Sequence, residues 1–125
     1  MDTMNSNNLV SYRWNAVDDQ SELNQVAFNA ILDNATKSIR QRGEFHFVLS
    51  GGDTPRKVYQ QLRFIQTNWS AWHIYFSDER CLLAGDQSLN SRMAGEAWLD
   101  HVPIPRNQLY EIPVGLGASL AAYEY

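Results

Sequence analysis

The stretch FVLSGGDTPRKVYQQL, residues 47–62, joins an apolar run to two glycines and then to a helical pattern. The apolar run starts earlier, as FHFVLS at residues 45–50, and its near lack of alternation predicts a parallel strand covered on both faces. Thr54 is the predicted N-cap of the helix and Pro55 its first residue, where a missing amide proton costs nothing. The stretch therefore predicts a strand, a glycine turn and a helix that extends to about Gln66.

The same order of strand and helix recurs along the rest of the chain. The other predicted elements are a strand at 9–14, a helix at 19–42 with Gly43 as its C-cap, a buried strand at 72–77, a helix at 90–100, a short strand at 109–112 and a helix that begins at Ala118. This alternation predicts the α/β class, with a doubly wound, mainly parallel sheet and helices on both faces. Because the pattern stops within its last helix, we expect residues 1–125 to form a single, truncated α/β domain.

Composition and charge disfavour several classes of protein. The net charge is −4 and the ten Lys and Arg residues are scattered, so we expect no nucleic acid partner. No apolar run approaches the roughly 20 residues that cross a bilayer, and the N-terminus lacks the pattern of a signal peptide, so we expect a cytoplasmic protein without membrane contact. The only cysteine, Cys81, cannot form an internal disulfide, and we expect it to pack as a small apolar side chain in a reducing compartment.

Gly51 and Gly52 follow the first buried strand, at the edge where open α/β sheets bind ligands. Glycines at this point allow a positive φ and a close approach of the backbone, and the following helix offers free N–H groups at the positive end of its dipole. The arrangement suits a phosphate, and the alternative is a tight turn that binds nothing. The chain has neither the G-x-x-x-x-G-K nor the G-x-G-x-x-G pattern, which disfavours nucleoside triphosphates and dinucleotides.

A second polar segment, SDER at residues 77–80, follows the second buried strand. Asp78 could act as a general base or orient a water molecule, and Arg80 could bind an anionic oxygen. The alternative is a structural ion pair that closes the end of the strand. Asn90 and Arg92 open the next predicted helix and could reach the same cavity, or they could serve as an N-cap and a solvated surface charge.

The three histidines are predicted to be structural. His46 and His73 lie within strands, with no Cys, Asp or Glu at metal-binding spacing beside them, so ordinary strand histidines are favoured over metal ligands. His101 follows Asp100 at a helix end, where its charge favours the helix dipole. We therefore expect no metal site.

Three blocks of the sequence together resemble the 6-phosphogluconolactonase family, which is related to glucosamine-6-phosphate deaminase. LSGGDTPRKVYQQL is similar to the sugar-phosphate loop of that family, FSDERCL to its acidic strand end, and DQSLNSRMAGEAWLDHVPIP to its next helix and proline turn. The deaminase branch usually has Tyr where this chain has Arg80, so the resemblance favours the lactonase branch.

The resemblance implies an enzyme that hydrolyses 6-phospho-D-glucono-1,5-lactone to 6-phosphogluconate in the pentose phosphate pathway, without metal or cofactor. Asp78 would then face the reacting ring, and Asn90 would support the cavity. The residues implied to surround or approach the phosphorylated sugar are Gly51, Gly52, Asp53, Thr54, Arg80 and Arg92.

The chain departs from the family pattern in two places. Ser91 stands where the family commonly has an aromatic residue, and the chain lacks the later Gly-x-Asp-Gly-His block that carries the family's catalytic histidine. We therefore expect the N-terminal part of a lactonase, with self-association through exposed core surface. The alternatives are a non-catalytic remnant that binds a sugar phosphate and an enzyme like glucosamine-6-phosphate deaminase or isomerase.

Overall fold

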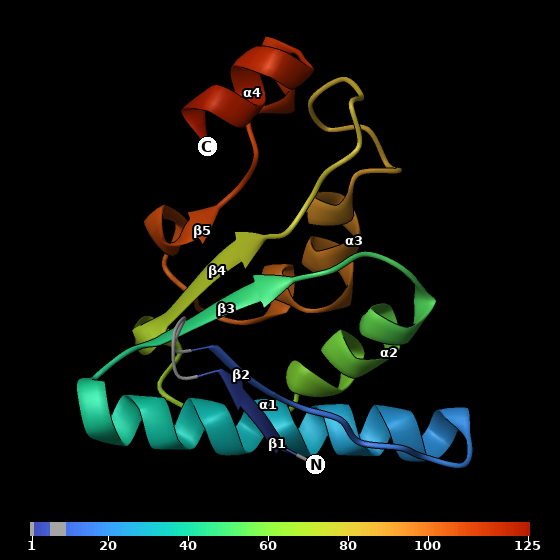
Figure 1. Ribbon diagram of the computed structural model, residues 1–125. Helices are drawn as coiled ribbons and strands as arrows, with labels where there is room; N and C mark the ends of the chain where they lie inside the picture. The colour runs from blue at the N-terminus through green and yellow to red at the C-terminus, as the bar shows by residue number, and fades with distance from the viewer. Residues whose placement is uncertain (1, 6–9) are drawn as a thin grey trace.

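The computed structural model describes residues 2–5 and 10–125, and its centre is a three-stranded sheet (Figure 1). The strands are β3 (Phe45–Leu49), β4 (Trp72–Phe76) and β5 (Leu109–Tyr110), in the order β3-β4-β5. Both strand pairs are parallel, and the register places Phe45 opposite Trp72 and Leu49 opposite Phe76. The predicted α/β class with a mainly parallel sheet is confirmed.

Helices connect these strands at the predicted places. The described residues form the α-helices α1 (Gln20–Arg42), α2 (Asp53–Leu62), α3 (Asn90–Ala97) and α4 (Ala118–Glu124), with 3-10 turns at Trp69–Ala71, Leu99–His101, Arg106–Gln108 and Val114–Leu116. Both ends of α1 are capped, and the predicted C-cap Gly43 is confirmed. The Asp19 carboxylate accepts the N–H of Glu22 at 2.8 Å, and Gly43, with a φ of 81°, donates its N–H to Ile39 at 2.9 Å.

The helix α2 begins two residues earlier than predicted and also ends earlier than predicted. It begins at Asp53 rather than Pro55, because the backbone leaves the helical region at Gly52, whose φ is 106°. It ends at Leu62 rather than Gln66, because the N–H groups of Phe64 and Ile65 bond to carbonyls three residues back in a tighter turn.

An antiparallel hairpin of β1 (Asp2–Asn5) and β2 (Val10–Arg13) precedes α1. The predicted strand at 9–14 is confirmed at β2, and Leu9 lies outside the described residues. Sequence analysis did not predict β1. The hairpin is a sheet of its own, separate from the three parallel strands.

Helices cover one face of the parallel sheet within the described residues. Phe45, Leu49 and Ile74 on that face are buried, whereas Val48 on the other face is 56% exposed. The prediction that β3 is covered on both faces is therefore wrong. The physical reason is the strand order. The strands β3, β4 and β5 follow one another across the sheet in the same order as in the sequence. The right-handed crossovers between them therefore place α2 and α3 on the same face.

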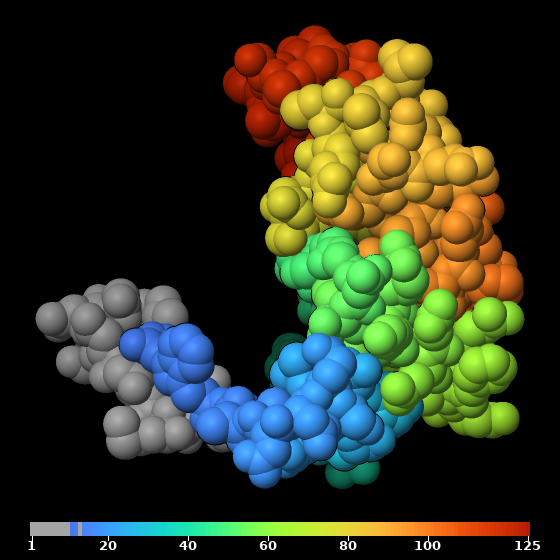
Figure 2. Space-filling model, turned by 90° about the vertical axis from the view of Figure 1, so that its right-hand side faces the viewer, coloured from blue at the N-terminus to red at the C-terminus, as the bar shows by residue number. Residues whose placement is uncertain are grey.

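Tryptophans fill much of the core between the sheet and the helices. The rings of Trp69 and Trp72 lie 4.9 Å apart and those of Trp72 and Trp98 5.7 Å apart, and Trp72 and Trp98 are fully buried. At the opposite end of the molecule from α1, α4 lies against the loop that follows β4 (Figure 2). Leu49 and Phe76, the last residues of β3 and β4, are buried in this core, which holds the ends of the two strands in place.

Candidate functional site

The carboxyl ends of β3 and β4 lie side by side. Both the backbone N–H and the hydroxyl of Ser77 donate to the carbonyl of Leu49, each at 3.0 Å. The glycine turn after β3 and the acidic segment after β4 therefore start from the same edge, as predicted for an open α/β sheet.

Gly51 lies directly against the side chain of Asn90. A Cβ built on Gly51 would be 2.7 Å from Cγ of Asn90, closer than real Cβ atoms approach. Gly52 is needed for a different reason, because its φ of 106° strains any residue with a side chain. Both glycines of the opening stretch thus have a structural cause within the protein itself.

Asn90 connects the glycine turn to the acidic segment. Its amide nitrogen lies 3.4 Å from both the carbonyl oxygen and Oδ1 of Asp78, and the residue is only 7% exposed. Asp78 itself is exposed. Of the predicted site residues, the structure therefore brings Gly51, Asp78 and Asn90 together.

Glu79 caps α3 from a distance in the sequence. Its carboxylate accepts hydrogen bonds from the backbone N–H of Asn90 at 2.6 Å and from that of Ser91 at 2.9 Å. It also accepts the backbone N–H of Arg80 at 2.9 Å. The N-cap position is Leu89, which offers no side-chain bond, so the alternative role of Asn90 as N-cap is wrong. Sequence reasoning missed this role of Glu79, because no local pattern links residues that are eleven positions apart.

The first turn of α2 is open to solvent at its N-terminus. No side chain within the described residues caps the start of the helix at Gly52, so the predicted N-cap role of Thr54 is wrong. The Thr54 hydroxyl instead accepts from Nε2 of Gln20 at 3.0 Å. Asp53 forms a 3.0 Å ion pair with Arg56, which partly offsets the negative charge it brings to this turn.

Tyr59 forms hydrogen bonds with the backbone of the turn between β3 and α2. Its hydroxyl accepts the N–H of Ser50 at 3.0 Å and donates to the Ser50 carbonyl at 3.1 Å. The residue is 4% exposed, and burial raises the pKa of its hydroxyl above the ordinary value, so the group stays protonated and can donate. Sequence analysis did not identify Tyr59, because it reads as one more apolar position of an amphipathic helix.

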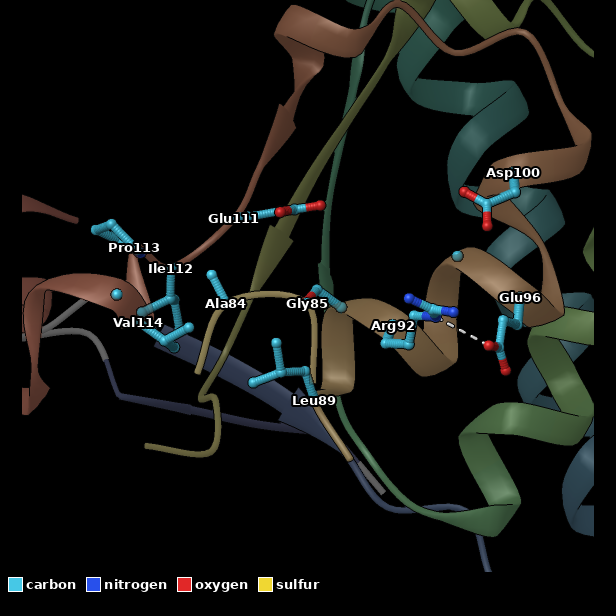
Figure 3. A pocket seen from close by; sticks show the side chains of 13 residues that line it. Ala84, Gly85, Leu89, Arg92, Glu96, Asp100, Glu111, Ile112, Pro113 and Val114 are labelled. Atoms are coloured by element: carbon cyan, nitrogen blue, oxygen red, sulfur yellow. Dashed lines mark hydrogen bonds and ion pairs between the residues drawn. The ribbon is translucent and has the colours of Figure 1, made fainter. Parts of the chain in front are cut away.

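Neither predicted arginine side chain forms a hydrogen bond or ion pair with Asp78 or Asn90 within the described residues. Arg80 is exposed, and no carboxylate among the described residues forms an ion pair with it, so the alternative of a structural pair closing the strand end is wrong there. Arg92 pairs with Glu96 at 2.9 Å and lines a cavity of about 440 Å³ (Figure 3). Asp100 and Glu111 line the same cavity, which makes it a poor place for an anion.

Asp78 lines a different cavity, of about 320 Å³, between the end of β4 and α4. Cys81 also lines it and is exposed, so the prediction that this thiol packs as a small apolar side chain is wrong. Apolar residues such as Ile112 and Val114 line the same cavity, but they leave the Cys81 side chain exposed.

The histidines differ from expectation in one respect. His101 is structural as predicted: its Nε2 lies 2.9 Å from the carbonyl of Glu96 near the end of α3. His46 and His73, however, do have an acidic neighbour, since Nε2 of each lies near the carboxylate of Glu44, at 3.1 Å and 3.5 Å. The expectation that no acid stands beside them is wrong: Glu44 lies two residues before His46 in the sequence, and the strand register places His73 opposite His46.

No helix within the described residues is both long enough and apolar enough to cross a membrane.

Comparison with known proteins identifies one family. The family model described as Glucosamine-6-phosphate isomerases/6-phosphogluconolactonase matches residues 18–125. The chain is 33% identical over 109 residues to a 6-phosphogluconolactonase of Nostoc sp. and 37% identical over 100 residues to a probable 6-phosphogluconolactonase 2 of Arabidopsis thaliana. The matches cover 85% and 74% of this chain but 45% and 39% of those proteins, so the chain spans less than half of their length.

Solved structures show the same fold. A 6-phosphogluconolactonase from Shewanella baltica superposes with a TM-score of 0.71 at 27% identity, over 86% of this chain and 48% of that one. A 6-phosphogluconolactonase from Thermotoga maritima superposes with a TM-score of 0.79, over 87% of this chain and 49% of that one. At 24% identity the second likeness supports the fold alone.

Proposed function

The chain belongs to the glucosamine-6-phosphate isomerase and 6-phosphogluconolactonase family, and we propose that its protein hydrolyses 6-phospho-D-glucono-1,5-lactone to 6-phosphogluconate in the pentose phosphate pathway. The names of the similar proteins and Arg80, in place of the tyrosine usual in the deaminase branch, support the lactonase reaction. As part of the same proposal, the ligand is a sugar phosphate, no cofactor takes part, and the protein works in the cytoplasm.

The position of Asn90 is the observation that carries the proposal. Its buried amide contacts Gly51 on one side and Asp78 on the other, so the glycine turn and the acid belong to one site. A ligand with a phosphate at one end and a reactive carbonyl at the other needs such a pair of neighbouring groups.

We assign the phosphate to the glycine turn and the start of α2. The start of α2 at Gly52 has no side-chain cap in the part of the chain that the structure describes, and the helix dipole favours an anion there. Arg56 balances the carboxylate of Asp53, which would otherwise repel a phosphate. Arg80, exposed and beside Asp78 in the chain, would meet the ligand from the other strand end.

The proposed reaction needs a base or an acid that orients water. Water attacks the carbonyl carbon, the bond from this carbon to the ring oxygen breaks, and the ring oxygen takes a proton while the product retains a carboxylate and releases a second proton. Asp78 is the exposed acid beside the cavity, and the Asn90 amide can hold its carboxylate in place. We therefore assign to Asp78 the orientation of the attacking water.

Binding can be tested on this chain, separately from hydrolysis. We would titrate the isotope-labelled chain with 6-phosphogluconate and follow the backbone amides by NMR, expecting the largest shifts at residues 51–54. Asp78→Asn should retain these shifts, as should Asp33→Asn, an exposed acid on α1 that serves as the matched control. If the shifts of residues 51–54 do not change, the assignment of the phosphate is wrong.

Hydrolysis of freshly prepared lactone is then compared with its spontaneous rate, beside an assay with glucosamine 6-phosphate. In a protein that also contains the family's histidine block, we expect the lactone alone to be turned over, with Asp78→Asn inactive and Asp33→Asn unaffected. Binding without turnover of either substrate would favour the alternative of a sugar-phosphate binding module. Turnover of the amino sugar alone would assign the chain to the deaminase branch.

A further inference from the structure

A cluster on the uncovered face of the sheet has no role in the proposed reaction. It consists of Glu44, His46 and His73, whose possible ligand atoms all lie within 4.8 Å of one another. The register of the parallel pair places His46 directly opposite His73, and the two rings stack with their centroids 4.6 Å apart. We propose that Glu44, His46 and His73 bind one zinc-class transition metal ion, which links β3 to β4.

The distances from the carboxylate to the rings fit such an ion. Oε1 of Glu44 lies 3.1 Å from Nε2 of His46, and Oε2 lies 3.5 Å from Nε2 of His73. Two ligands at about 2.0–2.1 Å from a tetrahedral zinc ion are about 3.3–3.4 Å from each other. The two carboxylate separations are close to this spacing, and the two Nε2 atoms would be brought to it by turning the rings. The ring planes are 19° from parallel, and rotation about the soft terminal torsion of each histidine would turn both Nε2 lone pairs toward one point.

Each histidine also has the outer partner that metal-bound histidines usually have. Nδ1 of His46 lies 2.9 Å from the Tyr75 hydroxyl, and Nδ1 of His73 lies 3.1 Å from the Tyr110 hydroxyl. A hydroxyl can accept as well as donate, so it can receive the Nδ1 proton and leave Nε2 free to bind metal. The outer partners are thus compatible with the tautomer that ligation requires.

The exposure of the three side chains shows how an ion can reach the cluster, and their chemical type indicates which ions they bind. The side chains of Glu44 and His46 are 50% and 47% exposed and that of His73 is 18% exposed, so an ion can enter and water can complete its coordination. Two imidazoles and one carboxylate suit zinc, copper, nickel or cobalt better than magnesium or calcium. A fourth protein ligand is not needed, since water takes the fourth place.

The proposal is tested on the tag-free chain, stripped with chelator, by calorimetric titration with zinc chloride and by the visible spectrum of added cobalt. We expect one ion per chain, cobalt bands typical of tetrahedral coordination, and a higher Tm with zinc. His46→Gln and Glu44→Gln should each weaken binding at least tenfold. The variants His101→Gln and Cys81→Ser serve as controls for other zinc ligands and should change binding less than twofold.

Glu44→Gln keeps the experiment decisive, because this half-exposed side chain lies outside the core and its loss should leave the circular dichroism spectrum unchanged. The proposal is overturned if zinc does not bind, or if folded Glu44→Gln binds as the parent does. It is also overturned if binding is lost in His101→Gln or Cys81→Ser instead.

Discussion

The carboxamide of Asn90 occupies the space that a side chain on Gly51 would need. A Cβ on Gly51 would lie 2.7 Å from Cγ of Asn90, and Asn90 in turn contacts Asp78. Sequence reasoning left open whether the two glycines serve a ligand or a turn. The structure shows that Gly51 makes room for a side chain of the site, whereas Gly52 provides a positive φ.

Gly51→Ala should therefore displace Asn90 and separate the glycine turn from Asp78. Overpacking of this kind costs about 1–3 kcal/mol, which urea unfolding would measure. Gly115→Ala is the matched control, because an added Cβ there meets Ala84 at an ordinary 4.0 Å. Equal stability of the two variants would show that Asn90 can move away without cost.

Glu79→Gln should weaken the start of α3. The carboxylate accepts the N–H groups of Asn90 and Ser91 at the positive end of that helix, and an uncharged amide would lose the favourable charge. We expect a loss of about 1–2 kcal/mol in the free energy of unfolding. Glu96→Gln removes an exposed pair with Arg92 and should cost about 0.5 kcal/mol or less. A similar loss in both variants would contradict the capping role.

Tyr59→Phe removes a hydroxyl that bonds both backbone groups of Ser50 and leaves the ring in the core. Because those groups would lose a buried partner, we expect a cost of about 1–3 kcal/mol. Amide hydrogen exchange at Ser50 should become faster, since its N–H loses its acceptor. Tyr123→Phe, at a tyrosine that is 85% exposed, should leave both quantities unchanged.

The pattern of the sequence was sufficient for the fold class and for most of the element positions. The apolar runs that became β3 and β4 and the capped α1 follow from local periodicity and from caps such as Asp19 and Gly43. The uncovered sheet face could not be predicted in this way. It depends on the order of the strands, and an apolar residue such as Val48 reads the same in a covered and an uncovered position.

The candidate site was predictable only where its residues follow strand ends directly. Gly51 and Asp78 are such residues, and their proximity follows from the parallel pairing of β3 and β4. The roles of Glu79 and Tyr59 depend on contacts across eleven and nine positions, which carry no periodic signal. The same reasoning explains why Glu44 was not linked to His73: the strand register brings them together, and no local spacing does.

The carboxyl group of Glu44 provides a prediction about pH. The hydrogen bond with His46, and the charges of His46, His73 and Arg42, lower the pKa of Glu44 below its ordinary value of 4.5. Because the folded-state pKa is the lower one, the stabilisation is present above pH 4.5 and is lost as the pH falls through the folded value. Carbon NMR of the metal-free chain should show Glu44 titrating below 4.5, and His46→Gln should raise its midpoint. A Glu44 midpoint that does not change in His46→Gln would mean that the 3.1 Å contact has no influence on the carboxyl group in solution.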